Sequence, residues 1–158
     1  MKLTVRRIQV SDLGPLCYLM NRFFEEQKLE YPIMDSEEVD AQLLDLLPAI
    51  NEPTRIYLIA YDGKKPIGYF LGFVGDKPYS KPRHILMALE LYVVPEKRNG
   101  RAAKKMLGMA ANIGLQHNAY HVETVGTYNG TDKRWMRYGF KPHFTYLHMD
   151  MERMKNYL

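Results

Sequence analysis

Cysteine and long hydrophobic runs are scarce in this chain, and each scarcity excludes a class of protein. The 158 residues include one cysteine, Cys17, so no disulfide can form within the chain. A small secreted domain held together by disulfides is therefore excluded. Cys17 lies in an apolar run, which favours a buried inert thiol over a nucleophile. No apolar stretch is long enough to cross a bilayer, so we expect no signal peptide, no membrane span and a cytoplasmic location.

Common nucleotide and metal motifs are also missing. The chain contains no Gly-x-x-x-x-Gly-Lys-Ser/Thr and no Gly-x-Gly-x-x-Gly near its first strand. His117 and His121 are four apart, but Asn118 separates a predicted helix from a predicted strand, so the two imidazoles should not share a face. We expect no metal, because none of the five histidines has ligand spacing: His84, His117, His121, His143 and His148.

The composition and the hydrophobic pattern predict one domain, over residues 1–158, with strands and helices around a single sheet. Hydrophobic residues make up 46% of the chain and charged residues 25%, as in ordinary globular domains. We predict helices over about 12–27, 36–48, 101–117 and 132–138. We predict strands over 3–9, 55–61, 66–74, 85–94 and 121–125, and a last strand or strand pair over 140–150.

Charge is distributed unevenly along the chain. The segment 25–45 contains eight acids and one base, so it carries −7, and the remaining residues carry +11. This pattern predicts one region that attracts cations and another that attracts phosphates, although two solvated faces would have the same composition. Nucleic-acid binding through the basic half is a weaker hypothesis, because the basic turn has no interleaved aromatic residues.

The most informative stretch is 91–107, in which a buried strand ends, a basic turn follows and a helix begins. The first N–H groups of a helix are free, and together with the helix dipole they bind phosphate. Gly100 removes a side chain where a ligand must approach the backbone closely, and two alanines keep the first helical turn narrow. An ordinary connection with a solvated turn explains the charge and the glycine equally well. The residues concerned are Lys97, Arg98, Gly100, Arg101, Ala102 and Ala103.

Residues 97–102, Lys-Arg-Asn-Gly-Arg-Ala, resemble the acyl-CoA signature Gln/Arg-x-x-Gly-x-Gly/Ala of the GCN5-related N-acetyltransferase superfamily, with Lys97 in place of the usual Gln or Arg. Residues 135–140 resemble the closing Tyr-x-x-x-Gly-Phe of that superfamily, and the order of elements matches along essentially the whole chain. The resemblance implies an α/β fold with a mixed, mostly antiparallel twisted sheet. It also implies splayed parallel strands 4 and 5, and helices on both faces.

The resemblance further implies acetyl-CoA as the acyl donor, bound between the strands 85–94 and 121–125, with no metal and no acyl-enzyme. In such a site the backbone of 91–93 pairs with the pantetheine arm, and the Val93 N–H stabilises the developing oxyanion. N–H groups of about 98–103 hold the pyrophosphate. The implied cofactor-binding residues are Leu91, Tyr92, Val93, Lys97, Arg98, Asn99, Gly100, Arg101, Ala102, Ala103, Asn129 and Trp135.

Glu90 is the candidate general base, since it is the only charged residue of the strand 85–94 and its burial should raise its pKa. A structural carboxylate bound to a neighbouring group is the alternative, and Glu123 is a weaker candidate base. The sequence does not identify the general acid, because Trp135 stands where the superfamily has tyrosine, and indole cannot give up its proton. Tyr138 or Tyr128 could replace it, or water could protonate the thiolate.

These features predict an enzyme that acetylates a primary amine directly. In the superfamily the two helices after the first strand flank the acceptor entrance, and here they carry the acidic segment. We therefore expect a cationic acceptor: a protein lysine or N-terminus, a polyamine, or an aminoglycoside-like base. A catalytically degenerate acyl-CoA-binding or protein-interaction module is the alternative function, and a homodimer is left open.

Overall fold

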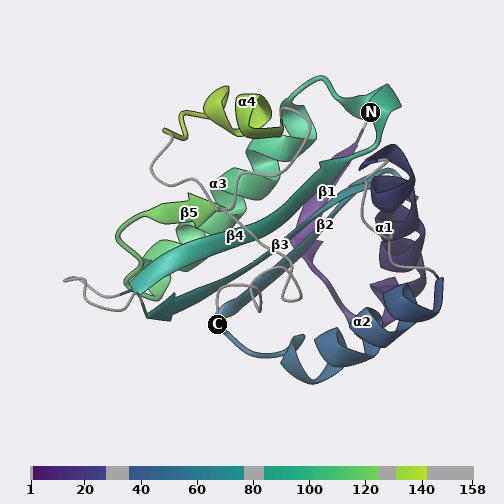
Figure 1. Cartoon of the computed structure of the whole chain (residues 1–158), viewed down its shortest axis with the longest axis horizontal. Helices are drawn as coiled ribbons and strands as arrows, with labels where there is room; N and C mark the ends of the chain where they lie inside the picture. Colours follow the sequence, from purple (N-terminus) through teal and green to yellow (C-terminus); the bar gives the residue numbers. More distant parts are fainter. Residues whose placement is uncertain (1, 28–35, 77–83, 125–130, 142–158) are drawn as a thin grey trace, which may run out of the picture. The chain divides into compact units, whose positions relative to one another are not determined.

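The computed structural model describes residues 2–27, 36–76, 84–124 and 131–141 (Figure 1). The chain divides into two compact units, Met1–Thr124 and Val125–Leu158, and each is described by itself. The prediction of one domain over 1–158 stays a prediction. None of the helices in the described part of the chain combines the length and hydrophobicity that a membrane span requires.

The first unit contains a five-stranded sheet in the order β1-β2-β3-β4-β5. Neighbouring strands are antiparallel from β1 to β4, whereas β4 and β5 are parallel. This arrangement confirms the mixed, mostly antiparallel sheet that the sequence predicts. The strands are β1 Leu3–Arg7, β2 Arg55–Asp62, β3 Lys65–Asp76, β4 His84–Val93 and β5 Val122–Thr124.

Helices cover both faces of this sheet (Figure 1). Helices α1 (Leu13–Gln27) and α2 (Ser36–Ala49) lie on one face, and α3 (Arg101–Gln116) lies on the other. Since successive strand residues point to opposite faces, a strand between two helical layers should be buried at every position. In β2 all five residues from Ile56 to Ala60 are buried, as this arrangement requires.

Most predicted elements are present, with ends that differ by a few residues. Helix α2 ends at Ala49, one residue beyond the predicted end, with Pro48 in its last turn. A short 3-10 turn, Val10–Asp12, with Gln9 as its N-cap, leads into α1. The predicted last strand lies mostly outside the described residues.

Asp12 is the one buried charged residue among those described, and it joins β1, β2 and the start of α1. It accepts hydrogen bonds from both terminal nitrogens of Arg6 (2.5 and 2.7 Å), from the Tyr61 hydroxyl (2.7 Å) and from the Gln9 N–H (2.8 Å). Burial alone would raise the pKa of Asp12, but these donors outweigh it and lower that pKa below 3.8. The ionised carboxylate therefore stabilises the fold.

Asp12→Asn should lower the free energy of unfolding at neutral pH by about 1–3 kcal/mol, because the amide keeps only one of the two acceptor oxygens and has no negative charge. Since the folded-state pKa is lowered, the wild-type advantage is complete above the unfolded pKa. It disappears progressively as the pH falls below about 5. Urea denaturation at several pH values measures the difference. Asp45→Asn, an exposed change on α2, should stay within about 0.5 kcal/mol. A constant gap between wild type and Asp12→Asn down to low pH would contradict this account.

Candidate active site

Strand β4 extends beyond its described pairing with β5. That pairing reaches Ala88 and Thr124, the last described residue of β5, and β4 continues to Val93. On the β3 side, Leu71 pairs with Glu90 and Gly72 with Ala88, so Leu89 is an extra residue that forms a β-bulge. Among the described residues, β4 beyond Ala88 has no partner strand on the side away from β3. Within the described structure, β4 therefore has an open edge between Leu89 and Val93.

The open edge presents backbone groups of Val93. The Val94 N–H donates to Ile67 O beside β3 (2.9 Å). Because N–H groups of an extended strand alternate in direction, the Val93 N–H points to the opposite, open side. The Val93 carbonyl points there too, since it accepts a bond from Arg98 Nε (2.8 Å). This edge can therefore pair with an extended ligand, as the sequence predicts for 91–93.

A buried hydroxyl lies at the end of the described pairing between β4 and β5. Thr124 Oγ1 is a buried side-chain oxygen that has no hydrogen-bond partner among the described residues. Thr124 is the last described residue of β5 and pairs with Ala88 of β4. An unsatisfied buried hydroxyl is costly, so this position favours a polar ligand group or water.

Glu90 directly follows the bulge, and its carboxylate contacts Tyr69 of β3. The Tyr69 hydroxyl donates to Glu90 Oε2 at 2.7 Å. Tyr69 is fully buried, with its ring against those of Tyr92 and Phe23. Burial raises the pKa of Glu90 above 4.5, and the hydrogen bond from Tyr69 partly opposes that rise. The other carboxylate oxygen is free to accept a proton, because no hydrogen bond to it is found among the described residues.

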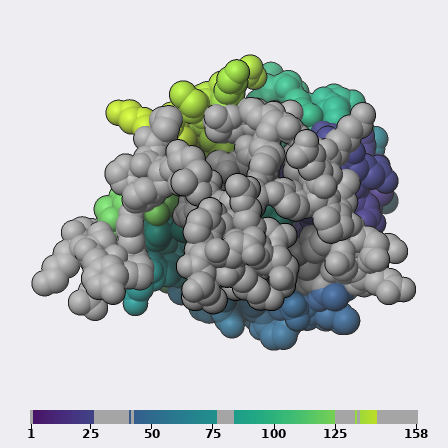
Figure 2. Space-filling view, in the orientation of Figure 1, coloured from purple at the N-terminus to yellow at the C-terminus, as the bar shows by residue number. Residues whose placement is uncertain are grey.

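The residues of the turn after β4, 95–100, are exposed or half-buried, and the part of the chain around residue 100 reaches the surface in Figure 2. Several N–H groups of this turn bond within the turn itself. It begins as a 3-10 turn, Pro95–Lys97, and its first donors bond to carbonyls within the turn. The Arg101 N–H donates to the side chain of Asn99 (3.1 Å). The N–H groups of Gly100, Ala102 and Ala103 have no acceptor among the described residues. These three N–H groups are therefore the backbone donors of the turn that could bind an anion. The N–H groups already bonded are those of Lys97, Arg98, Asn99 and Arg101.

Gly100 has a structural reason to be glycine that the sequence does not reveal. Its φ of 82° lies in the left-handed region, which residues other than glycine adopt only with backbone strain. A Cβ added there would meet nothing within 4 Å. The open space beside Gly100 is consistent with close approach of a ligand to the backbone.

Two of the three predicted cations of the turn are held by carboxylates. Lys97 Nζ contacts Asp62 Oδ2 of β2 at 2.8 Å, and Arg98 pairs with Glu26 of α1 at 2.5 Å. Arg101 and Lys104, in the first turn of α3, are exposed and have no ion-pair partner among the described residues. These two cations are therefore available for a phosphate group.

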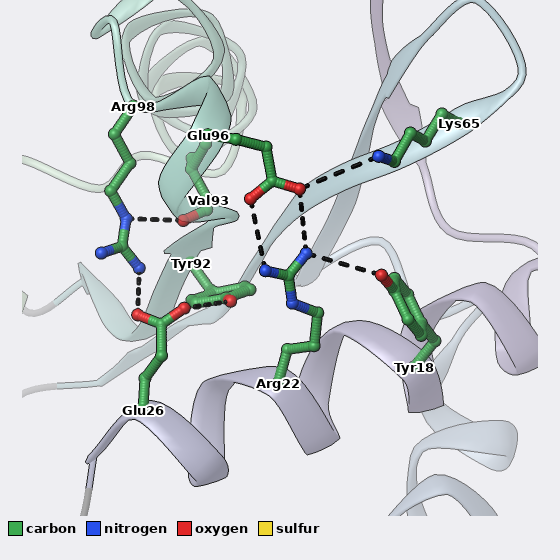
Figure 3. A network of polar contacts seen from close by, with 8 residues as sticks. All are labelled: Tyr18, Arg22, Glu26, Lys65, Tyr92, Val93, Glu96 and Arg98. Atoms are coloured by element: carbon green, nitrogen blue, oxygen red, sulfur yellow. Dashed lines mark hydrogen bonds and ion pairs between the residues drawn. The ribbon is translucent and has the colours of Figure 1, made fainter.

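Helix α1 contacts both sides of this turn through residues one helical turn apart (Figure 3). Arg22 forms two hydrogen bonds to the carboxylate of Glu96 (3.1 and 3.2 Å), and Lys65 lies 3.8 Å from the same carboxylate. The hydrogen bonds from Arg22 lower the pKa of Glu96 to about 2. Tyr18 accepts a long hydrogen bond from Arg22 (3.5 Å).

Glu26 connects α1 to the end of β4. Its carboxylate accepts from the Tyr92 hydroxyl (2.6 Å) and from Arg98, whose guanidinium also lies 5.6 Å from the centre of the Tyr92 ring. Burial and the hydrogen bond to Glu26 raise the pKa of Tyr92, so its hydroxyl stays protonated as a donor. Tyr92 is thus a packing and hydrogen-bonding residue at the end of β4.

The remaining predicted site residues lie elsewhere. Trp135 and Tyr138 belong to the second unit, in which α4 (Thr131–Met136) ends before Gly139 and the rings of Trp135 and Phe140 lie 4.9 Å apart. Asn129 and Tyr128 lie outside the described residues, so the roles assigned to all four stay predictions.

Glu123 of β5 contacts His121 Nε2 at 2.7 Å. Over the described ranges, no group of three or more His, Cys, Asp or Glu side chains could hold a metal ion.

Sequence reasoning missed Tyr69 and the two contacts of α1. Glu26 counted only as a member of the acidic segment, although it binds a residue of the basic turn. The local sequence indicates only that Arg22 and Glu26, four residues apart, lie on the same face of a helix. Nothing in the sequence indicates which distant residues that helix face would contact.

Tyr69→Phe should raise the pKa of Glu90 further, because it removes the donor that favours the ionised carboxylate. A pH titration of the Glu90 side-chain carboxyl by carbon NMR measures the shift. Tyr92→Phe is the matched control: it removes the hydroxyl of the neighbouring ring, which donates to Glu26, and should leave the Glu90 titration in place. Equal titration curves in wild type and Tyr69→Phe would refute this role of Tyr69.

Solved structures share this fold over nearly the whole chain. A predicted acetyltransferase from Clostridium acetobutylicum, crystallised with acetyl-CoA, has a TM-score of 0.75 and 18% identity; the match covers 96% of this chain and 98% of that protein. Glucosamine-6-phosphate N-acetyltransferase from Arabidopsis thaliana has a TM-score of 0.70 and 10% identity, covering 95% and 99%. Aminoglycoside 6'-N-acetyltransferase from Acinetobacter baumannii has a TM-score of 0.74 and 14% identity, covering 94% and 97%.

The sequence comparisons give the family. No curated protein matches the chain significantly. The model of the acetyltransferase (GNAT) family matches residues 20–140. That range includes β4 with its open edge, the glycine turn and the first turn of α3, and the matched structures share the sheet in which these parts lie. The chain therefore belongs to the acetyltransferase (GNAT) family.

Proposed function

We propose that this protein is an acetyl-CoA-dependent N-acetyltransferase that transfers an acetyl group directly to a primary amine. One observation carries the proposal: the open edge of β4 lies between a half-buried carboxylate, Glu90, and a turn with free N–H groups at the start of α3. An acyl donor, a base and an anion site are what direct transfer to an amine requires.

The residues present fit coenzyme A. The N–H groups of Gly100, Ala102 and Ala103 would hold the pyrophosphate at the positive end of the α3 dipole, with Arg101 and Lys104 adding charge. The β4 edge would pair with the pantetheine arm. When bound, acetyl-CoA supplies an activated thioester. The Val93 N–H would donate to the carbonyl oxygen of that thioester, which becomes more negative as the amine attacks.

Glu90 would take the proton from the acceptor ammonium. Its raised pKa brings it closer to neutral pH than an ordinary carboxylate, and Tyr69 fixes the orientation of the carboxylate while leaving one oxygen free. Because the base must be ionised, the rate should fall as the pH decreases through the raised pKa. A general acid from Tyr138 stays part of the proposal, with water as the alternative.

The acceptor is proposed to be a cationic amine. Two of the similar structures are named for acetylation of amino sugars or aminoglycosides, which supports an amine acceptor. The −7 charge of the segment 25–45 favours a cation, although Glu26 of that segment is paired with Arg98. Three further acids of that segment, Glu37, Glu38 and Asp40, have side chains outside those described.

Gly100→Glu should weaken acetyl-CoA binding at least tenfold, because it places a negative charge beside the proposed pyrophosphate site. Gly100→Ala is the control, since it has the same strain at φ 82° without the charge. Calorimetric titration of both variants separates the two effects. Equal affinities in Gly100→Glu and Gly100→Ala would contradict the cofactor assignment.

The function itself is tested by release of coenzyme A thiol from acetyl-CoA across a panel of lysine peptides, polyamines and aminoglycosides. We expect turnover with at least one cationic amine, and a fall in kcat of about 10²-fold in Glu90→Gln with acetyl-CoA affinity retained. Loss of rate in Glu123→Gln with a normal Glu90→Gln would move the base to Glu123. Tight acetyl-CoA binding without any turnover would instead identify a degenerate acyl-CoA-binding module.

A further inference from the structure

We propose that Arg98 is a positioning residue for the reaction: its side chain holds the end of β4 so that the Val93 N–H faces the open edge. This inference rests on the proposed function only in assigning a use to that N–H. It differs from the role that the charge of the turn suggests, in which Arg98 binds the phosphates of the donor.

Three contacts fix the guanidinium of Arg98. Its Nε–H donates to the Val93 carbonyl at 2.8 Å, and a terminal nitrogen contacts Glu26 of α1 at 2.5 Å. Its central carbon lies 5.6 Å from the centre of the Tyr92 ring, and the Tyr92 hydroxyl donates to the same Glu26 carboxylate at 2.6 Å. Figure 3 shows Arg98 in contact with both Val93 at the end of β4 and Glu26 of α1, and the Tyr92 hydroxyl in contact with the same Glu26.

The peptide unit between Val93 and Val94 is held on both sides as a result. Its N–H, on Val94, donates to Ile67 O at 2.9 Å, and its carbonyl, on Val93, accepts from Arg98. The Val93 N–H belongs to the preceding peptide unit and in extended backbone points to the same side as the Val93 carbonyl. Among the described residues, no neighbouring strand pairs with these groups. Arg98 therefore takes the place of a partner strand at one acceptor, the Val93 carbonyl.

Pairing with Glu26 also makes Arg98 a poor phosphate ligand. A phosphate would have to displace a charge-assisted hydrogen bond and separate the guanidinium from the Tyr92 ring. Arg101 differs in this respect, because it is exposed and has no ion-pair partner among the described residues. The turn thus contains two arginines with separate roles, and Arg101 is the natural control for Arg98.

Comparison of acetyl-CoA with acetyl-pantetheine, a donor without the pyrophosphate, distinguishes the two roles. Arg98→Gln should lower kcat about 10- to 100-fold with both donors, since the displaced N–H acts on the thioester that both contain. Arg101→Gln should raise KM for acetyl-CoA and leave acetyl-pantetheine kinetics unchanged. Arg98→Lys should not rescue kcat, because an ammonium cannot bond to Glu26 and Val93 with the geometry of Arg98. An Arg98→Gln defect confined to acetyl-CoA, or full rescue by lysine, would overturn the proposal.

A second measurement does not need turnover. In the free protein, Arg98→Gln should shift the amide NMR signal of Val93 and speed its hydrogen exchange, whereas Arg101→Gln should leave both as in wild type. An unchanged Val93 amide in a folded Arg98→Gln variant overturns the proposal. A changed amide in a protein that acetylates no amine supports the positioning role and refutes the proposed function.

Discussion

Leu89 has no partner on β3, and the consequences of this one extra residue reach every part of the candidate site. A bulge increases the local bend and twist of a strand, and directly before it lies the last described pair with β5. Beyond the bulge the strand keeps its bonds to β3, and its other edge has no partner strand in the described part of the chain. The bulge also places Ala88 and Glu90 on opposite faces, so that Glu90 lies on the face of the buried Tyr69. In a regular strand of the same sequence, without the bulge, Glu90 would share the face of Ala88 and point away from Tyr69.

Helix α1 secures the end of this strand and the turn that follows. Arg22 and Glu26, one helical turn apart, contact Glu96 and Arg98 respectively, so a single helix face holds both sides of the turn. These ion pairs also change the interpretation of the charge pattern. The acidic segment and the basic turn are not separate surfaces throughout, because Glu26 of the first neutralises Arg98 of the second. The net charge of a sequence segment therefore indicates which ligands the segment attracts only after its internal ion pairs are known.

The sequence predicted the elements well, because a period of two or of 3.6 residues is a local property. The strand carboxylate Glu90 and the turn with Gly100 were identifiable for the same reason: each stands out in its own short segment. The partner of Glu90 was not predictable, since it depends on the register between β3 and β4, which the bulge shifts by one residue. Arg98 and Glu26 are 72 residues apart, and their contact depends on where α1 packs on the sheet. Contacts set by packing leave no local pattern.

The turn uses some of its donors to hold its own shape and leaves others without an acceptor among the described residues. Backbone bonds use the N–H groups of residues 97–99, and the Asn99 side chain takes the N–H of Arg101. These bonds, with Gly100 at a positive φ, set the turn before any ligand arrives, so less conformational entropy is lost on binding. Lys97 and Arg98 contribute to this preorganisation through their ion pairs. The proposed anion site then depends on groups without a partner among the described residues: the N–H groups of Gly100, Ala102 and Ala103 and the side chains of Arg101 and Lys104. Under this proposal, a basic turn that is largely neutralised by internal ion pairs can still bind phosphate, because its remaining donors are already oriented.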